Sequence, residues 1–250
     1  MLTVLFVIGI TAEAMTAALA AGRQRMDLFG VCMIACVTAL GGGTMRDLLL
    51  AHYPLRWVNE PVFLLIVVVA ALVTVLTSVL MSYFRTIFLL LDSLGLAAFS
   101  VLGTQVALGE GHGLIIACMA AVVTGVFGGV ARDILCDRVP LVFSDELYAS
   151  VAFVAAVLYY AMHTNGVPEQ VTVIVTLVVA FTLRVLSIYF KISLPVFEYQ
   201  ERHYARDPAG RLTMWILNRA GVRRRTLKKK RVGNVRREEE EKEEEGPEGR

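Results

Sequence analysis

A short motif inside an apolar stretch occurs twice, and this repetition constrains the fold more than any other feature of the chain. The first copy is Gly-Gly-Gly-Thr-Met-Arg-Asp over residues 41–47, and the second is Gly-Gly-Val-Ala-Arg-Asp over residues 128–133. The copies align without a gap, and from residue 32 to residue 49 ten of eighteen positions are identical to their partners. Similar composition explains shared Val and Ala, but not a shared Arg-Asp pair. The chain therefore contains an internal repeat.

Composition places this repeat in a membrane protein. The chain is 56% hydrophobic and 18% charged, with a mean hydropathy of +0.64, whereas soluble domains carry about 25% charged residues. Most of the charged residues follow residue 190, so the preceding part is more apolar still. The four cysteines lie in or at the ends of apolar segments, which favours buried thiols over a disulfide framework or a metal site.

Seven segments approach the ~20 residues that a helix needs to cross a bilayer. They cover about residues 2–22, 27–51, 61–83, 86–108, 112–136, 147–164 and 168–190. The expected fold is an all-α polytopic membrane protein. Spans one to three match spans four to six, and because three is odd, the second copy enters the membrane from the opposite side, as in inverted-repeat transport proteins.

The repeat divides the chain into four parts. Residues 1–83 form the first three-helix repeat, 84–164 the second, inverted repeat, and 165–190 the seventh helix. Residues 191–250 form a charged tail that we expect to be cytoplasmic and largely disordered, because it carries a basic block followed by an acidic block.

Glycines at membrane depth mark the second and fifth spans as candidate broken helices. A glycine inside a helix costs roughly 1 kcal/mol relative to alanine, and irregular backbone is tolerated in a membrane only in protein or along a wet cavity. Three threonines beside the glycines could supply oxygens to an ion or form helix-to-helix hydrogen bonds. The candidate pore and kink residues are Gly41, Gly42, Gly43, Gly128, Gly129, Thr38, Thr44 and Thr124.

The motif also places charges in the membrane, at Arg46, Asp47, Arg132 and Asp133. An ionised side chain there costs about 2.5–3.5 kcal/mol on insertion scales, which makes such residues functional candidates. They could line or gate a polar path at the interface between the repeats. Alternatively, Arg46 could pair with Asp133, and Arg132 with Asp47, and lock the bundle. The two interpretations are compatible.

Two further acids break the symmetry of the repeat. Glu13 lies near the middle of the first span and aligns with Phe99, whereas Asp92 lies early in the fourth span and aligns with Phe6. Either acid could attract cations or titrate. The alternative is a buried carboxyl group that is hydrogen-bonded to a neighbouring helix or paired with Arg184 of the seventh span.

Basic residues near the ends of the spans predict the orientation. They are more frequent on the side that carries the tail, so we expect the N-terminus outside and the C-terminus in the cytoplasm. The tail would favour anionic lipids through Arg223, Arg224, Arg225, Lys228, Lys229 and Lys230. The sequence contains no folded nucleic-acid module, no metal-ligand spacing and no enzyme motif, so we expect no nucleic-acid partner, no cofactor and no catalysis.

The doubled motif, each copy followed by Pro-Leu, in a chain built as three plus three plus one spans, resembles the prokaryotic members of the TRIC family, the trimeric intracellular cation channels. The resemblance covers roughly residues 3–190. It implies a homotrimer with a pore in each protomer and kinks at the glycines of spans two and five. It also implies a prokaryotic plasma membrane location and passage of monovalent cations, potassium above all and sodium after it. Phe127 stands where the first copy has Gly41, so the two kinks need not be equivalent.

The favoured function is thus a potassium-selective channel that is constricted at the glycines. Bacterial relatives of this family are also described as glycine transporters, so a secondary transporter of glycine or another small solute remains the alternative. A structural or regulatory membrane protein is the third hypothesis. Inverted repeats with broken helices favour the first two.

Overall fold

The computed structural model describes residues 1–77, 84–143 and 147–190, and within these ranges the regular structure is entirely helical. The tail from 191, with the basic residues expected to bind lipid, lies outside them. The elements are α1 (Leu2–Arg23), α2 (Leu28–Leu50), α3 (Arg56–Asn59), α4 (Val62–Thr77), α5 (Phe84–Gly109), α6 (Leu114–Leu135), the 3-10 helix η2 (Leu141–Phe143), α7 (Ala149–Thr164) and α8 (Glu169–Phe190).

The predicted spans are found as helices. Five of them, α1, α2, α5, α6 and α8, are long and apolar enough to cross a membrane, and α4 and α7 are shorter apolar helices of 16 residues. The expectation of an all-α polytopic membrane protein is therefore confirmed. The short helices α3 and η2 follow the Pro-Leu of each motif copy and were not anticipated.

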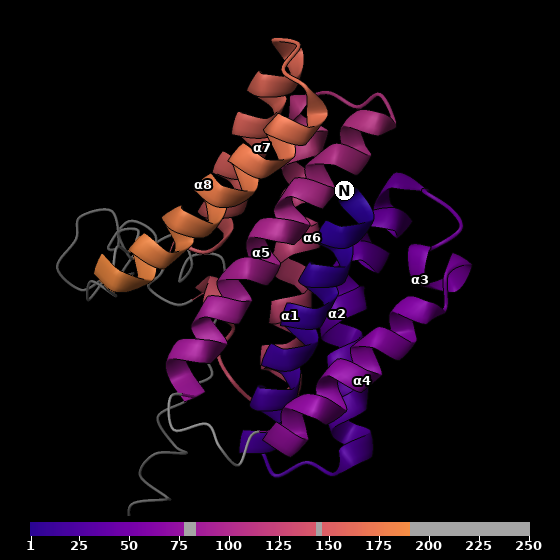
Figure 1. Ribbon diagram of the computed structural model, residues 1–250, viewed down its shortest axis with the longest axis vertical. Helices are drawn as coiled ribbons and strands as arrows, with labels where there is room; N and C mark the ends of the chain where they lie inside the picture. The colour runs from indigo at the N-terminus through magenta and orange to yellow at the C-terminus, as the bar shows by residue number, and fades with distance from the viewer. Residues whose placement is uncertain (78–83, 144–146, 191–250) are drawn as a thin grey trace, which may run out of the picture. The chain divides into compact units, whose positions relative to one another are not determined.

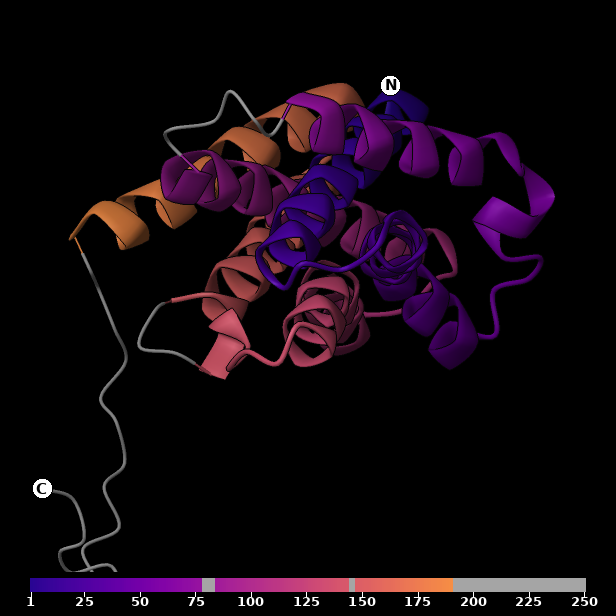
Figure 2. The same cartoon turned by 90° about the horizontal axis from the view of Figure 1, so that it is seen from below.

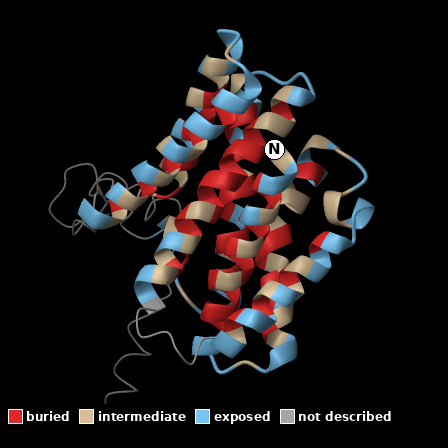
Figure 3. Cartoon of the chain, in the orientation of Figure 1, coloured by how far each residue is buried: buried red, intermediate tan, exposed pale blue. Residues whose placement is uncertain are grey.

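The helix α1 lies at the centre of the bundle. It packs against α2, α4 and α5, whereas α6 packs against α2, α5 and α7 (Figure 1). The view along the bundle shows α4 and α8 on its outside (Figure 2). Buried residues follow α1 and the inner faces of α5 and α6, and the outer faces of α4 and α8 are exposed (Figure 3). Those exposed faces are apolar, as expected for surfaces that meet lipid.

The turns repeat as well as the helices. Ala51 ends α2 and Asp137 follows α6, at equivalent positions of the repeat, and both adopt a left-handed conformation, with φ of 54° and 52°. The next amide in each turn donates back to the carbonyl of the motif aspartate, from His52 to Asp47 and from Arg138 to Asp133, both at 2.8 Å. This is the hydrogen bond of a Schellman motif, and it fixes the helix end beside each motif aspartate.

The glycines do not interrupt the helices, which corrects the expectation of broken spans two and five. The helix α2 continues from Leu28 to Leu50 and α6 from Leu114 to Leu135, through all five motif glycines. The physical reason lies in the neighbouring helix. A Cβ atom on Gly42 would overlap the carbonyl oxygen of Thr124, so the glycine is needed for close packing of two backbones.

Candidate functional site

The two motif helices meet at a contact that we call the glycine seam, formed by Gly42 and Gly128 with Thr38 and Thr124. A Cβ on Gly42 would overlap the Thr124 carbonyl oxygen, and a Cβ on Gly128 would overlap the Thr38 carbonyl oxygen. Residues 42 and 128 are repeat partners, as are 38 and 124, so the contact is reciprocal. Reciprocal contacts of this kind arise when the two helices are related by two-fold symmetry. Residue 42 faces residue 124 and residue 38 faces residue 128, so α2 and α6 run antiparallel.

The other candidate glycines lie beside the seam. A Cβ on Gly41 would lie 3.7 Å from the ring of Phe127, its own repeat partner. On Gly43 it would come within 4.0 Å of the Arg46 guanidinium, and on Gly129 within 3.1 Å of the Tyr148 hydroxyl. A methyl group would fit at Gly41 and Gly43 and would be tight at Gly129. Of the five motif glycines, Gly42 and Gly128 are the two that face the backbone of the other helix.

The candidate threonines use their hydroxyl protons within their own helices. Thr38 donates to the carbonyl of Ile34 at 2.7 Å, and Thr124 donates to that of Ala120 at 2.6 Å. Thr44 donates to the carbonyl of Leu40 at 2.8 Å. Hydroxyl groups bonded in this way do not link helices as donors, but their oxygens can still accept.

The motif charges pair within each copy, so the alternative in which they pair across the repeat is wrong. The Arg46 guanidinium donates to the Asp47 carboxylate at 2.6 and 2.8 Å, and Arg132 donates to Asp133 at 2.9 Å. The antiparallel register of the glycine seam explains this. Residue 133 lies opposite residue 33, so 13 residues, or about 20 Å of helix at 1.5 Å per residue, separate it from Arg46.

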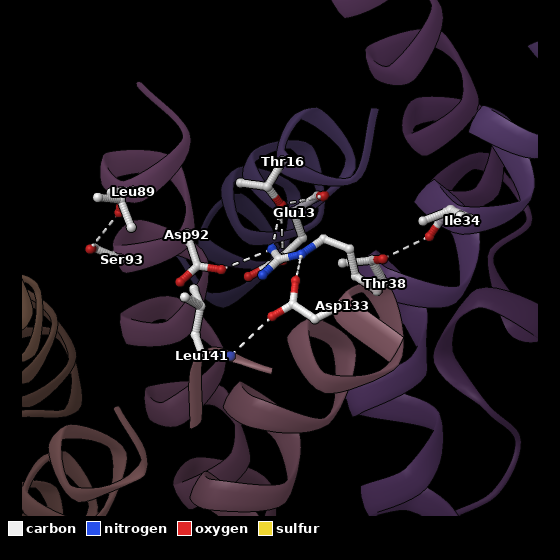
Figure 4. Close-up of polar contacts among 10 residues, drawn as sticks. Glu13, Thr16, Ile34, Thr38, Leu89, Asp92, Ser93, Asp133 and Leu141 are labelled. Atoms are coloured by element: carbon white, nitrogen blue, oxygen red, sulfur yellow. Dashed lines mark hydrogen bonds and ion pairs between the residues drawn. The ribbon is translucent and has the colours of Figure 1, made fainter. Parts of the chain in front are cut away.

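Arg132 is the centre of a buried charge cluster that brings together three carboxylates from three helices. Figure 4 labels these three acids, Glu13, Asp92 and Asp133. Its Nη1 lies 2.8 Å from Asp92 Oδ1 of α5 and 3.6 Å from Glu13 Oε2 of α1, and it donates to the Thr16 hydroxyl at 3.0 Å. Its Nε donates to Asp133. The side chains of Arg132, Glu13 and Asp92 are at most 2% exposed.

Surrounding groups fix this cluster in place. Asp133 Oδ2 accepts the backbone amide of Leu141 at 3.1 Å, and the Arg132 guanidinium lies 4.7 Å from the centroid of the Phe88 ring. The predicted candidates Glu13 and Asp92 are thus placed together with Arg132 and Asp133. Arg184, which the sequence offered as their partner, lies over the Tyr148 ring at 4.7 Å and donates to the Leu147 carbonyl at 3.4 Å.

Arg46 has different surroundings, because the repeat partners of Glu13 and Asp92 are aromatic residues. Among the described residues, Asp47 is the one carboxylate bound to Arg46. Nearby, the Arg56 guanidinium lies 4.3 Å from the centroid of the Phe6 ring and 5.5 Å from that of Phe63. Burial lowers the pKa of Arg56, and the charge of Arg46 lowers it further.

Sequence reasoning missed several residues that complete these sites. Thr16 lies one turn after Glu13 and donates to Glu13 Oε2 at 3.3 Å, a spacing that could have been noticed. Trp57 donates its indole proton to Thr44 at 3.0 Å from the unanticipated α3. The Glu13 carboxylate packs against Gly95, because a Cβ at that position would overlap Glu13 Oε1. Gly95 is the repeat partner of Gly9, but the sequence does not indicate that it lies against Glu13.

Comparison with known proteins matches this arrangement to one family. A family model described as "Glycine transporter" matches residues 3–78 and again residues 89–164. The inner membrane protein YadS of Escherichia coli is 36% identical over 200 residues, which cover 78% of this chain and 95% of YadS. A membrane protein of Deinococcus radiodurans is 35% identical over 191 residues, which cover 76% of this chain and 88% of that protein.

Solved structures of related membrane proteins also match this chain. The TRIC trimeric intracellular cation channel orthologue of Rhodobacter sphaeroides superposes with a TM-score of 0.74 at 32% identity, over 76% of this chain and 98% of that one. A prokaryotic TRIC channel crystallised in 0.5 M KCl superposes with a TM-score of 0.72 at 29% identity, over 77% of this chain and 98% of that one. The chain is therefore a membrane protein that belongs to the prokaryotic TRIC family, which the family model describes as glycine transporters.

Proposed function

We propose that the protein is a channel for monovalent cations, potassium above all and sodium after it. The observation that carries this proposal is the superposition on TRIC cation channels over nearly their whole length, at 32% identity. The charge cluster supports it, because three buried carboxylates face one guanidinium within the helical bundle. Negative charge at membrane depth favours cations and disfavours anions.

The proposed assembly is a homotrimer in which each protomer has its own pore. The TRIC relatives are described as trimeric, and one protomer already contains both motif copies and the charge cluster. The pore would run inside the protomer past the motif charges. Its constriction would lie at the glycine seam, where α2 and α6 approach most closely.

The proposed location is the prokaryotic inner membrane, as the name of YadS indicates for that relative. Arg23, Arg25, Arg85 and Arg138 lie on one side and Arg56 on the other, which favours an external N-terminus and a cytoplasmic C-terminus. The basic tail would then bind anionic lipids of the inner leaflet.

Planar-bilayer recording of the purified protein in a KCl gradient tests the channel. We expect discrete unitary currents that reverse near the potassium equilibrium potential. When sodium replaces potassium on one side, the reversal potential should shift in the direction that a lower permeability to sodium requires. Bilayers with detergent alone are the control. Macroscopic flux without unitary currents, or reversal near the chloride potential, would contradict the proposal. Native mass measurement of the same sample tests the trimer.

Glycine transport is a second candidate, and two observations favour it. The family model carries that description, and the charge cluster has both free acceptors and free donors. Glu13 Oε1 and Asp92 Oδ2 have no hydrogen-bond partner in the described part of the chain, and neither do Arg132 Nη2 and the Tyr148 hydroxyl. A zwitterion could satisfy both kinds. Saturable uptake of labelled glycine into liposomes, without unitary currents, would establish this function instead.

A further inference from the structure

The charge cluster carries more negative than positive charge. Glu13, Asp92 and Asp133 face the single guanidinium of Arg132, all of them buried. The guanidinium of Arg184 lies over the Tyr148 ring, 4.7 Å from its centroid. Even with Arg184 counted, the ionised cluster retains a net negative charge. A buried charge without a partner is unfavourable, so the cluster calls for a further positive ligand.

Two carboxylate oxygens are free to receive such a ligand. Asp92 Oδ1 accepts a hydrogen bond from Arg132. Glu13 Oε2 forms an ion pair with Arg132 and accepts a hydrogen bond from the Thr16 hydroxyl. The remaining oxygens, Glu13 Oε1 and Asp92 Oδ2, are buried and have no hydrogen-bond partner among the residues that the structure describes. Buried polar atoms are nearly always satisfied in native proteins, so two free acceptors in one cluster indicate a ligand.

The helix α5 brings the two acids to one interface. Glu13 reaches from α1 to the backbone of α5 at Gly95, where a Cβ would overlap Glu13 Oε1. Asp92 lies three residues before Gly95, which places the two positions on the same face of α5. The glycine thus leaves room for the Glu13 carboxylate beside the Asp92 carboxylate. Glu13 Oε1 therefore lies in the α1–α5 interface, and the buried Asp92 Oδ2 belongs to the neighbouring carboxylate of α5.

We propose that Glu13 Oε1 and Asp92 Oδ2 bind a monovalent cation at this interface. This inference rests on the proposed function, since the ion would be the permeant one. Carboxylate oxygens are hard ligands, and alkali-metal ions are hard cations that bind such ligands. A divalent ion is less suited, because calcium takes six to eight oxygen ligands and the Arg132 guanidinium lies against both carboxylates. The repeat partners are Phe99 and Phe6, so each protomer has one such site, on the Arg132 side.

Thermal unfolding of the full-length protein in detergent tests the site without any need for conduction. KCl is compared with N-methyl-D-glucamine chloride at equal ionic strength. We expect potassium to raise the unfolding temperature of the wild type in a saturable way. In Glu13→Gln and Asp92→Asn the apparent dissociation constant should rise at least tenfold. Glu110→Gln removes an exposed carboxylate outside the charge cluster and the motif and is the control, which should keep the wild-type potassium dependence.

Crystals of the wild type grown with rubidium provide a readout that does not depend on variants that fold. Anomalous density between Glu13 and Asp92 is the expected result, and no density there would overturn the proposal. Infrared spectra test for a proton in place of the cation. A protonated-carboxyl band that is lost in Glu13→Gln and unchanged by potassium would show a bound proton and reject the cation.

The site and the channel can fail separately. Wild-type potassium currents without any potassium-dependent stabilisation or rubidium density would reject the site and keep the channel. Potassium stabilisation that is lost in Glu13→Gln, in a protein without unitary currents, would keep the site and reject the channel. Stabilisation of the wild type by glycine, and not by potassium, would reject the cation site in favour of a zwitterion.

Discussion

Arg46 and Arg132 occupy equivalent positions of the repeat, and their surroundings differ. Arg132 contacts three carboxylates and a threonine hydroxyl and is fully buried, whereas the Arg46 side chain binds Asp47 and retains 7% exposure. Two of the acids beside Arg132, Glu13 of the first repeat and Asp92 of the second, have Phe99 and Phe6 as their repeat partners. The comparison shows that the two motif copies share a backbone and differ in the charges that surround their arginines.

The features that remain symmetric are those that depend on the backbone. The glycine seam is reciprocal, and the turns after α2 and α6 have the same left-handed residue and the same hydrogen bond to the motif aspartate. Only a residue without a side chain fits each seam position. The charged side chains around each arginine are under no such constraint, so the charge beside one arginine can change while both repeats keep the shared backbone.

Replacement of either arginine by methionine should show the largest difference between the halves. Arg132→Met leaves three buried carboxylates without their cation, and we expect the free energy of unfolding to fall by about 3–5 kcal/mol or the protein to fail to fold. Arg46→Met leaves one carboxylate and should cost less. Unfolding in mixed micelles measures both. Equal losses in the two variants would contradict the asymmetry of the charges.

Alanine at the seam glycines should show equal effects in the two halves. Gly42→Ala and Gly128→Ala each force a methyl group against a carbonyl oxygen of the facing helix, and overpacking of this kind costs about 1–3 kcal/mol. Gly22→Ala is the matched control, because nothing lies within 4 Å of its Cβ position. We expect it to be neutral or stabilising by about 0.5–1 kcal/mol. A seam variant as stable as Gly22→Ala would refute the close approach.

Glycine at the left-handed turn residues should show the smallest difference. Ala51→Gly relieves a side chain from a left-handed conformation, which should stabilise the protein by about 0.5–1 kcal/mol. Asp137→Gly should gain less, since aspartate adopts this conformation more readily than alanine. Thermal unfolding under identical detergent conditions measures both. A larger gain at Asp137 would mean that the two turns differ in a way that their backbone does not show.

The sequence was sufficient for the helices, because apolar length and the repeat depend on residues close together in the chain. It also identified Glu13 and Asp92 as breaks in the symmetry, and the structure places both on Arg132. The pairing of the motif charges could not be predicted, since it follows from the register in which α2 crosses α6. The predicted breaks at the glycines were wrong for a related reason, because the sequence does not distinguish a glycine that interrupts a helix from one that lets a neighbouring helix pack closely.

The glycine seam also limits how the protein can move. At the seam a glycine of one helix faces the backbone of the other, so no side-chain rotation can widen the contact. An ion path that crosses the seam therefore widens only when α2 or α6 shifts as a rigid rod. Such collective displacements take microseconds to milliseconds, far longer than the picosecond to nanosecond rotation of an exposed side chain. Opening and closing at this place would be slow events between discrete arrangements, and each would involve both copies of the repeat at once.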